Sequence, residues 1–369
     1  SVTHANALVL DNSTAFNADV ANFEVLSLGA IAASTGAANA DDTSLNMTNI
    51  DGINSVKLAG SAAATNAQVN TIANLASGAT FEQTALLGAN ASVALTGAFT
   101  GSSDVANIKA TATDGFANAG ALTVAAVETI NITLDDSDTT AATVMYDLNM
   151  DAANATSFVV TGDAGITFAN GTQAALTSMD ASGVTATGAA GVVTFTANAA
   201  MNTTIKGGAG NDALTGNTGN NILTGGEGID VLIGGSGNDQ LFGGLGRDQL
   251  VGGQGDDIYE VDSRSDRVIE SLDEGSDTVN ASIDYVLASN IENLVLTGSD
   301  NIAGGGNSLD NHIIGNSGNN LINGGLGADT MEGAAGDDIY IVGSASDVII
   351  DTSGNDTIRS TIDLNLQTG

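Results

Sequence analysis

The feature that most constrains the fold of this sequence is a glycine-rich repeat with a period of nine residues. Six units run in register from Gly207 to Glu260: GGAGNDALT, GNTGNNILT, GGEGIDVLI, GGSGNDQLF, GGLGRDQLV and GGQGDDIYE. A second run, from Gly315 to Ile341, reads GNSGNNLIN, GGLGADTME and GAAGDDIYI. A short fixed period of this kind is typical of stacked repeats, in which each unit buries its apolar face against its neighbours.

Each position in the unit has a physical explanation. Glycines at the first, second and fourth positions allow a positive φ and a close approach of the backbone to a ligand. The last three residues alternate, so Leu232, Leu241, Leu250 and Tyr259 are expected to point inward. The sixth position is usually Asp, and stacking units two apart would place like charges about 4.8 Å from each other. A divalent cation between successive turns would remove this repulsion.

These residue types predict calcium sites. Carboxylates and turn carbonyls supply the hard oxygen ligands, at about 2.3–2.6 Å, that Ca²⁺ prefers, whereas Mg²⁺ demands a tighter octahedron. The predicted side-chain ligands are Asp212, Asp230, Asp239, Asp248, Asp257, Asp329 and Asp338, with Asn221 and Asn320 at positions where a weaker or missing site is expected. The predicted carbonyl ligands are Gly208, Gly210, Gly226, Gly228, Gly235, Gly237, Gly244, Gly246, Gly253, Gly255, Gly325, Gly327 and Gly336. The alternative is that these Asp residues only form Asx turns.

The repeat resembles the GGxGxDxUx nonapeptide of RTX proteins, in which U is a large apolar residue, and the resemblance covers about Lys206–Ile341. It implies a parallel β-roll with two nonapeptides per turn, type I export and an extracellular location. Counting stacked neighbours gives roughly five to seven Ca²⁺ ions for the two arrays. A longer repeat is also present, because Asp257-Ile258-Tyr259 recurs as Asp338-Ile339-Tyr340, a shift of 338 − 257 = 81 residues.

Composition excludes several function classes. The 369 residues include 7 Lys and Arg against 43 Asp and Glu, a formal charge of −36, so no basic surface for nucleic acid is expected. The absence of Cys excludes disulfides and thiolate chemistry. No apolar run of about 18 residues occurs, so no transmembrane segment is expected.

The sequence also argues against an enzyme. No HExxH, GxSxG or GKS/GKT motif occurs, and His4 and His312, the only histidines, are far apart in sequence. A uronan-modifying β-helix enzyme is a remote alternative. It would need clustered basic or aromatic residues to hold a polyanionic sugar, and residues 1–205 offer only Lys57, Lys109, His4 and Tyr146.

The fold that we expect is all-β: an elongated right-handed parallel β-helix that continues into calcium-binding RTX parallel β-rolls. A β-sandwich is the alternative, although aromatic residues, at 4%, are scarce for its core. A short helix is expected within residues 62–87. The expected segments are an irregular β-helix at 1–205, a first β-roll at 206–262, a β spacer at 263–305, a second β-roll at 306–342 and the truncated start of a second spacer at 343–369.

A second resemblance suggests a role. Residues 141–216, with ATSFVVTGDAGITF and TIKGGAGNDALTG, are similar to the carboxyl-terminal part of Caulobacter-like RTX surface-layer (S-layer) proteins. This implies a structural protein of the bacterial cell surface that packs with copies of itself into a calcium-dependent lattice or filament, with a cell-surface polysaccharide as a candidate partner. The alternative is an RTX adhesin, or a calcium-binding module of a larger secreted toxin or enzyme. Asp135, Asp136 and Asp138 form either an extra calcium site or a solvated loop.

Overall fold

The structure is a computed structural model, and its regular elements are β-strands throughout the part that it describes. The described residues are 2–3, 25–28, 43–46, 55–58, 68–73, 77–83, 91–96, 103–112, 116–117, 122–136, 145–168, 173–198 and 202–362. Within these residues no helix is long and apolar enough to cross a membrane. All the pairings between named strands are parallel, as the sequence predicts for a β-solenoid.

The chain divides into two compact units, residues 1–213 (unit 1) and 214–369 (unit 2). In unit 1, successive rungs pair in three series. The first comprises β1 (Val2–Thr3), β2 (Val25–Leu28), β4 (Ser55–Leu58), β6 (Thr80–Gln83), β8 (Val105–Ala112), β11 (Thr129–Asp136), β14 (Ser157–Gly162), β16 (Ser178–Val184) and β18 (Thr204–Lys206). The second comprises β3 (Thr43–Asn46), β5 (Gln68–Ala73), β7 (Ala91–Thr96), β10 (Leu122–Val124) and β13 (Met150–Asp151). The third comprises β9 (Phe116–Ala117), β12 (Met145–Leu148), β15 (Gly165–Phe168) and β17 (Val193–Thr196).

The prediction of a helix within residues 62–87 is wrong for the part of that range that the structure describes. Residues 68–73 form β5 and residues 80–83 form β6. Strand β5 pairs with β7 along its full length, from Gln68 opposite Ala91 to Ala73 opposite Thr96. The Ala-rich composition favours a helix, but pairing with neighbouring rungs decides the local conformation here.

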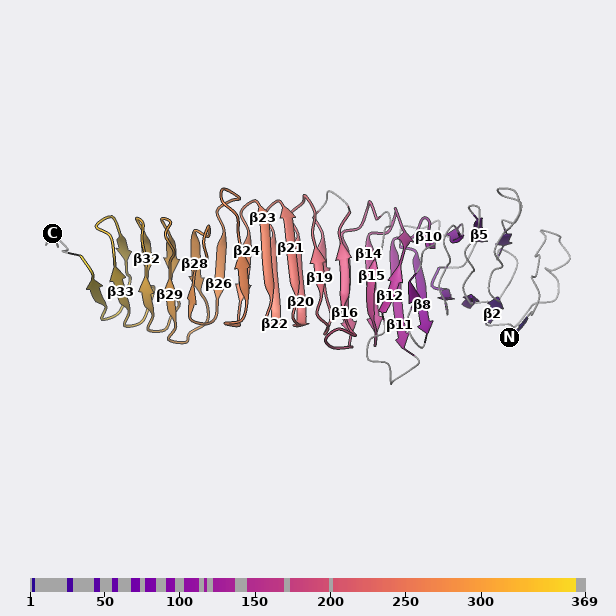
Figure 1. The fold of residues 1–369 in the computed structure, drawn as a ribbon, viewed down its shortest axis with the longest axis horizontal. Helices are drawn as coiled ribbons and strands as arrows, with labels where there is room; N and C mark the ends of the chain where they lie inside the picture. Colours follow the sequence, from indigo (N-terminus) through magenta and orange to yellow (C-terminus); the bar gives the residue numbers. More distant parts are fainter. Residues whose placement is uncertain are drawn as a thin grey trace. The chain divides into compact units, whose positions relative to one another are not determined.

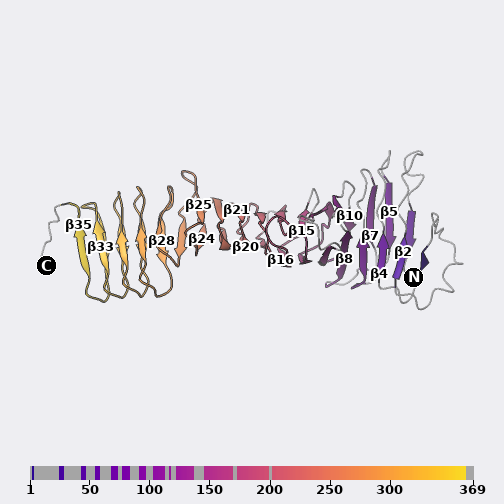
Figure 2. The same ribbon diagram turned by 60° about the horizontal axis from the view of Figure 1, so that its bottom comes forward.

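Unit 2 stacks its strands in the same way, and Figures 1 and 2 show them as successive rungs. One series comprises β20 (Ile222–Gly228), β22 (Gln240–Gly246), β24 (Ile258–Val261), β26 (Thr278–Ala281), β28 (Asn293–Leu296), β30 (His312–Ile314), β32 (Thr330–Glu332) and β34 (Val348–Ile350). The others are β21 (Val231–Ser236), β23 (Gln249–Gln254) and β25 (Arg267–Ile269), and β27 (Tyr285–Val286), β29 (Ala303–Gly305), β31 (Leu321–Asn323), β33 (Ile339–Val342) and β35 (Thr357–Ser360). The remaining strand, β19 (Ala213–Thr215), spans the boundary between the units.

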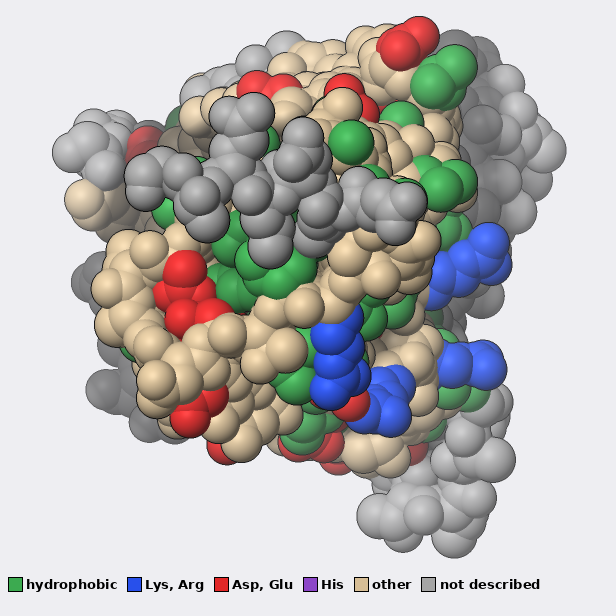
Figure 3. Space-filling view, turned by 90° about the vertical axis from the view of Figure 1, so that its left-hand side faces the viewer, with side chains coloured by type: hydrophobic (Ala, Val, Ile, Leu, Met, Phe, Trp, Pro, Cys, Tyr) green, Lys and Arg blue, Asp and Glu red, His purple; other side chains and the backbone are tan. Residues whose placement is uncertain are grey.

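The register of unit 2 confirms two nonapeptides per turn. Leu223 lies opposite Leu241, which lies opposite Tyr259, and Leu232 lies opposite Leu250. All five side chains are fully buried, so the inward direction expected from the alternation is confirmed. In the end view of Figure 3, hydrophobic side chains lie toward the middle of the face and acidic side chains lie mostly nearer its edge. A column of stacked aliphatic side chains therefore forms the core of the unit.

Candidate metal sites

Five sixth-position aspartates of unit 2 accept the same hydrogen bond from the turn before them, namely Asp239, Asp248, Asp257, Asp329 and Asp338. The backbone N–H of Asn221 donates to Oδ1 of Asp239 over 2.6 Å, and the N–H of Asp239 donates to Oδ1 of Asp257 over 2.7 Å. On the other edge, the N–H of Asp230 donates to Oδ1 of Asp248 over 2.9 Å. Each bond joins residues 18 apart in sequence, so the aspartates form two ladders, one on each edge of the roll.

The same ladders form in the second array. Asp329 accepts from the N–H of Asn311 over 2.9 Å, and Asp338 accepts from the N–H of Asn320 over 2.7 Å. Every one of these bonds uses Oδ1 of the aspartate. The second oxygen of each side chain is therefore left to another partner.

That second oxygen lies close to the first glycine of its own unit. In the described residues, Oδ2 of Asp239, Asp248, Asp257, Asp329 and Asp338 is buried and accepts no hydrogen bond. A Cβ built on the first glycine of the same unit would lie closer than 3.0 Å to that oxygen, as at Gly234 for Asp239 and Gly252 for Asp257. The first glycine thus gives space beside the carboxylate, while the second and fourth supply positive φ, as at Gly235 (117°) and Gly237 (114°).

Burial makes these carboxylates difficult to ionise. It raises the pKa of Asp239 and Asp248 to about 6 and that of Asp257 to about 7, although hydrogen bonds from the neighbouring backbone oppose the shift. It also raises the pKa of Asp329 and Asp338. A buried carboxylate with an unpaired oxygen is costly unless a cation or a proton neutralises it. The residues present therefore fit a hard divalent cation bound by oxygen.

Comparison with known families agrees with this chemistry. The sequence model of the RTX calcium-binding nonapeptide repeat matches four copies, at residues 200–232, 224–259, 305–340 and 341–360. These segments are therefore similar to RTX calcium-binding repeats, and they contain the aspartates whose buried oxygens lack a donor. A comparison with curated proteins gave no match.

The RTX aspartates do not all have the same surroundings. In unit 1, Oδ1 of Asp212 accepts from the N–H of Val193 over 2.7 Å and Oδ2 accepts from the N–H of Gly208 over 2.6 Å. Burial raises the pKa of Asp212 to about 6. Asp230 is fully buried on the same edge of the roll as Asp248. That each predicted RTX side chain ligates calcium stays a prediction.

The two asparagines in the sixth position, Asn221 and Asn320, donate hydrogen bonds from their side-chain amides to nearby oxygens. Nδ2 of Asn320 donates to the carbonyl of Ile302 over 3.2 Å and to Oδ1 of Asn316 over 3.0 Å. Nδ2 of Asn221 donates to Oδ1 of Asp239 over 3.1 Å. An amide donor thereby contacts oxygens that a cation would otherwise contact. These contacts support the expectation that sites at Asn221 and Asn320 are weaker, which stays a prediction.

Most of the glycines predicted as carbonyl ligands have the backbone that the repeat requires. Positive φ is found at Gly226, Gly228, Gly235, Gly237, Gly244, Gly246, Gly253, Gly255, Gly325, Gly327 and Gly336. Gly208 and Gly210 are buried but do not have this conformation. The turns of the first array from Gly226 onward therefore have one repeated geometry, and the role of their carbonyls stays a prediction.

The acidic run in unit 1 lies only partly within the described residues, because Asp138 falls outside them. Oδ2 of Asp135 forms an ion pair with Nζ of Lys109 over 2.7 Å. The N–H of Asp136 donates to Oδ1 of Asp163 over 2.8 Å. Lysine therefore already neutralises Asp135, which favours the solvated-loop alternative for this run.

Sequence reasoning missed acidic residues that extend the ladders beyond the nonapeptides. Oδ1 of Asp266 accepts from the N–H of Asp248 over 3.2 Å, and Oδ1 of Asp277 accepts from the N–H of Asp257 over 2.9 Å. In the second array, Oδ1 of Asp347 accepts from the N–H of Asp329, and Oδ1 of Asp356 accepts from the N–H of Asp338. The signal that could have found Asp266 and Asp347 is the 81-residue repeat, since 347 − 266 = 81. Glu270, also missed, lies close to Asp257 and Asp277.

Proposed function

We propose that this chain is a structural, non-enzymatic component of an extracellular surface array, and that calcium folds unit 2 after type I secretion. The observation that supports it is the pair of ladders of buried carboxylates, in which one oxygen of each of five aspartates meets no described donor, namely Asp239, Asp248, Asp257, Asp329 and Asp338. Without a cation these groups oppose the stacking of turns. With one, the same groups hold successive turns together.

Calcium-coupled folding fits the conditions on the two sides of a cell envelope. Extracellular calcium-binding modules have dissociation constants of about 10⁻⁴–10⁻³ M. A site of that affinity stays empty at cytosolic calcium levels and fills outside, so the chain would pass through a secretion channel unfolded. The sequence contains no Pro, which removes slow cis–trans isomerisation from folding after release.

Side-by-side packing of copies is supported by exposed apolar side chains in unit 2. Leu245 and Leu326 are 66% and 71% exposed, and both occupy the third position of a GGLG segment. Leu272 and Val286 are similarly exposed. Large apolar side chains that recur at one position of a repeat form a regular pattern for contact with another copy.

The ion pairs of unit 1 support a structural role over a sugar-modifying one. Lys57 pairs with Glu82 over 2.9 Å, Lys109 with Asp135 over 2.7 Å and Lys206 with Asp180 over 3.7 Å. Each pair links adjacent rungs, so these lysines stabilise the stack. A site for a polyanionic sugar would need such cations unpaired.

The test is negative-stain electron microscopy of the full chain in about 5–10 mM calcium and in chelator. Sheets or filaments that form only in calcium are expected. A variant with Leu245→Glu and Leu326→Glu should still gain β structure in calcium, measured by circular dichroism, but should not assemble. Dispersed particles of the wild type in calcium would contradict the array and favour an adhesin or a module of a larger secreted protein.

A further inference from the structure

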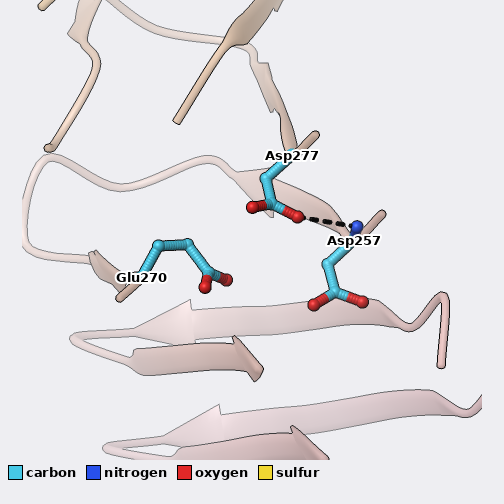
Figure 4. Close-up of side chains that lie close together, drawn as sticks. All are labelled: Asp257, Glu270 and Asp277. Carbon is cyan, nitrogen blue, oxygen red and sulfur yellow. Dashed lines mark hydrogen bonds between the residues drawn. The ribbon is translucent and has the colours of Figure 1, made fainter. Parts of the chain in front are cut away.

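Three carboxylates meet where the first array of nonapeptides ends. Asp257 precedes β24, Glu270 follows β25 and Asp277 precedes β26. One carboxylate oxygen of each residue lies within 4.8 Å of those of the other two, and all three side chains are buried. Figure 4 shows the three carboxylates facing a common region, and the dashed line marks the bond from the N–H of Asp257 to Asp277.

Glu270 is the unusual member of this cluster. The residue is 8% exposed, and neither of its carboxylate oxygens accepts a hydrogen bond from a donor in the described residues, although the carboxyl group of Glu274 lies within hydrogen-bond reach. Oδ2 of Asp257 is likewise buried and without a donor. These three oxygens, two from Glu270 and one from Asp257, are therefore buried without a donor. Leaving a buried polar atom without a partner costs free energy.

Among the residues that the structure describes, no ion pair involves this cluster. Within residues 202–362, the ion pairs are Arg264–Asp284 and His312–Glu332, and neither involves the cluster. The nearest further charges are also acidic. Glu274 lies beside Glu270, and Glu292 accepts from the N–H of Asp277 over 2.9 Å. The charges of Asp277 and Asp257 add to burial in raising the pKa of Glu270 to about 8.

The loop that carries Glu270 and Asp277 is held against the preceding turn. The N–H of Gly255 donates to the carbonyl of Glu274 over 2.7 Å, and the N–H of Ser276 donates to Oδ1 of Asp256 over 2.9 Å. A Cβ on Gly275 would overlap the carbonyl of Gly255. These contacts fix the positions of both acidic residues independently of any ligand, so the cluster is built into the fold.

We propose that Asp257, Glu270 and Asp277 form a separate divalent-cation site that closes the open end of the first RTX array. Oxygens bound to one Ca²⁺ at about 2.3–2.6 Å can lie up to about 5 Å apart, which accommodates the observed 4.8 Å limit. Glu270 and Asp277 lie outside the residues that match the RTX repeat, so the site is additional to those of the nonapeptides. It does not depend on whether the chain forms an array.

The second array provides a weaker counterpart of this site. Asp338, Asp351 and Asp356 also bring three oxygens within 4.8 Å, but Asp351 and Asp356 are exposed. The hydroxyl of Tyr340 donates to Oδ2 of Asp351 over 2.5 Å. In the first cluster the corresponding Tyr259 hydroxyl accepts from the N–H of Gly252 over 2.7 Å, and Glu270 keeps both oxygens available. The site at Glu270 should therefore bind calcium more tightly.

The test measures calcium bound per full-length chain, by equilibrium dialysis at neutral pH, for the wild type and three variants. Glu270→Gln and Asp277→Asn should each bind one ion fewer at saturation. Asp273→Asn removes an exposed carboxylate from the same loop, at a positive φ of 62° that Asn tolerates, and should bind as many ions as the wild type. The rise in Tm caused by calcium should shrink by several degrees in the first two variants only.

Asp277→Asn keeps the Oδ1 atom that accepts the hydrogen bond from the N–H of Asp257, so this variant should still fold. If Glu270→Gln does not fold, Asp277→Asn therefore tests the site. Equal calcium binding and an equal rise in Tm for Asp277→Asn and Asp273→Asn would overturn the proposal. The cluster would then be a group of carboxylates that share protons. Assembly plays no part in either measurement, so failure of the site and failure of the array are distinguishable.

Discussion

Units 1 and 2 stack parallel β-rungs in the same way but neutralise their acidic residues differently. In unit 1 the distance in sequence between bonded rungs varies, as in the hydrogen bonds that join residues 24, 28 and 21 apart. Lysines on one rung pair with acids on the next. In unit 2 the ladders repeat every 18 residues, and the ion pairs of its described residues, Arg264–Asp284 and His312–Glu332, do not involve the buried carboxylates.

The difference shows which part of the fold depends on conditions outside the protein. Unit 1 pairs three of its acidic residues with lysines on neighbouring rungs, so its stability should change less with calcium than that of unit 2. Unit 2 leaves the neutralisation to a cation or to protons. Its 18-residue turns are interrupted between β24 and β30, where paired residues lie 20, 15 and then 19 apart in sequence, and the proposed site of Glu270 lies in this stretch.

The largest effect is expected from pH in the absence of calcium. The pKa is about 6 for Asp239, Asp248 and Asp277, about 7 for Asp257 and about 8 for Glu270, all raised by burial. Folded unit 2 therefore binds more protons than the unfolded chain, and its stability should fall as pH rises from about 5 to 8. In chelator, the Tm of unit 2 should drop over this range, measured by circular dichroism.

Unit 1 provides the comparison for the pH experiment. Burial alone would raise the pKa of Asp180. Hydrogen bonds from Ser182 and the charge of Lys206 outweigh burial, so the pKa of Asp180 is lowered. That group stabilises the fold above its unfolded pKa, the opposite sign, whereas the raised pKa of Asp212 in unit 1 has the direction found in unit 2. Millimolar calcium should abolish the pH dependence of unit 2. A dependence that persists in calcium would contradict neutralisation of the ladders by the ion.

The next largest effect is expected from Gly252→Ala. The new Cβ would overlap Oδ2 of Asp257 and the hydroxyl of Tyr259. Overpacking a buried site should cost about 3 kcal/mol and remove calcium binding at Asp257, measured by urea unfolding with and without calcium. The control is Gly188→Ala in unit 1, where φ is 59° and nothing lies within 4 Å of the Cβ. It should cost about 1 kcal/mol of backbone strain and leave calcium binding unchanged.

A smaller effect, with a change of sign, is expected from Asp239→Asn. The Asn keeps the oxygen that accepts from Asn221 but loses the buried charge. In 10 mM calcium the variant should lose about 1.4–2.7 kcal/mol, the value of one site with a dissociation constant of 10⁻³–10⁻⁴ M. In chelator it should be more stable than the wild type. Asp180→Asn in unit 1 should lose the same small amount in both conditions, because its partner is Lys206.

The smallest effect is expected from Asn320→Asp. The new carboxylate would lose the two hydrogen bonds that Nδ2 of Asn320 donates and would face the carbonyl of Ile302. Without calcium it should destabilise the chain by about 1 kcal/mol, and with calcium it should create a tighter site. Calorimetric titration checks this. An unchanged calcium affinity would show that the sixth position does not determine the strength of a site.

The sequence predicted what depends on the nine-residue period, namely the parallel turns, the 18-residue register and the inward side chains such as Leu241. The aspartates that it selected lie on two ladders for the same reason. Glu270 and Asp277 were missed because they reach the ladder through turns that do not follow that period. The strand at residues 68–73 was mistaken for a helix because rung pairing overrides local propensity.

Hydrogen exchange measured by mass spectrometry on the full chain, in calcium and in chelator, tests the central claim most directly. Backbone bonds that link successive turns of unit 2, such as those from Gln240 to Asn221 and from Ile258 to Asp239, should be much more strongly protected in calcium than in chelator. Bonds between rungs of unit 1, such as that from Thr129 to Asp104, should stay protected in both conditions. Equal protection of unit 2 with and without calcium would contradict the claim that calcium folds it.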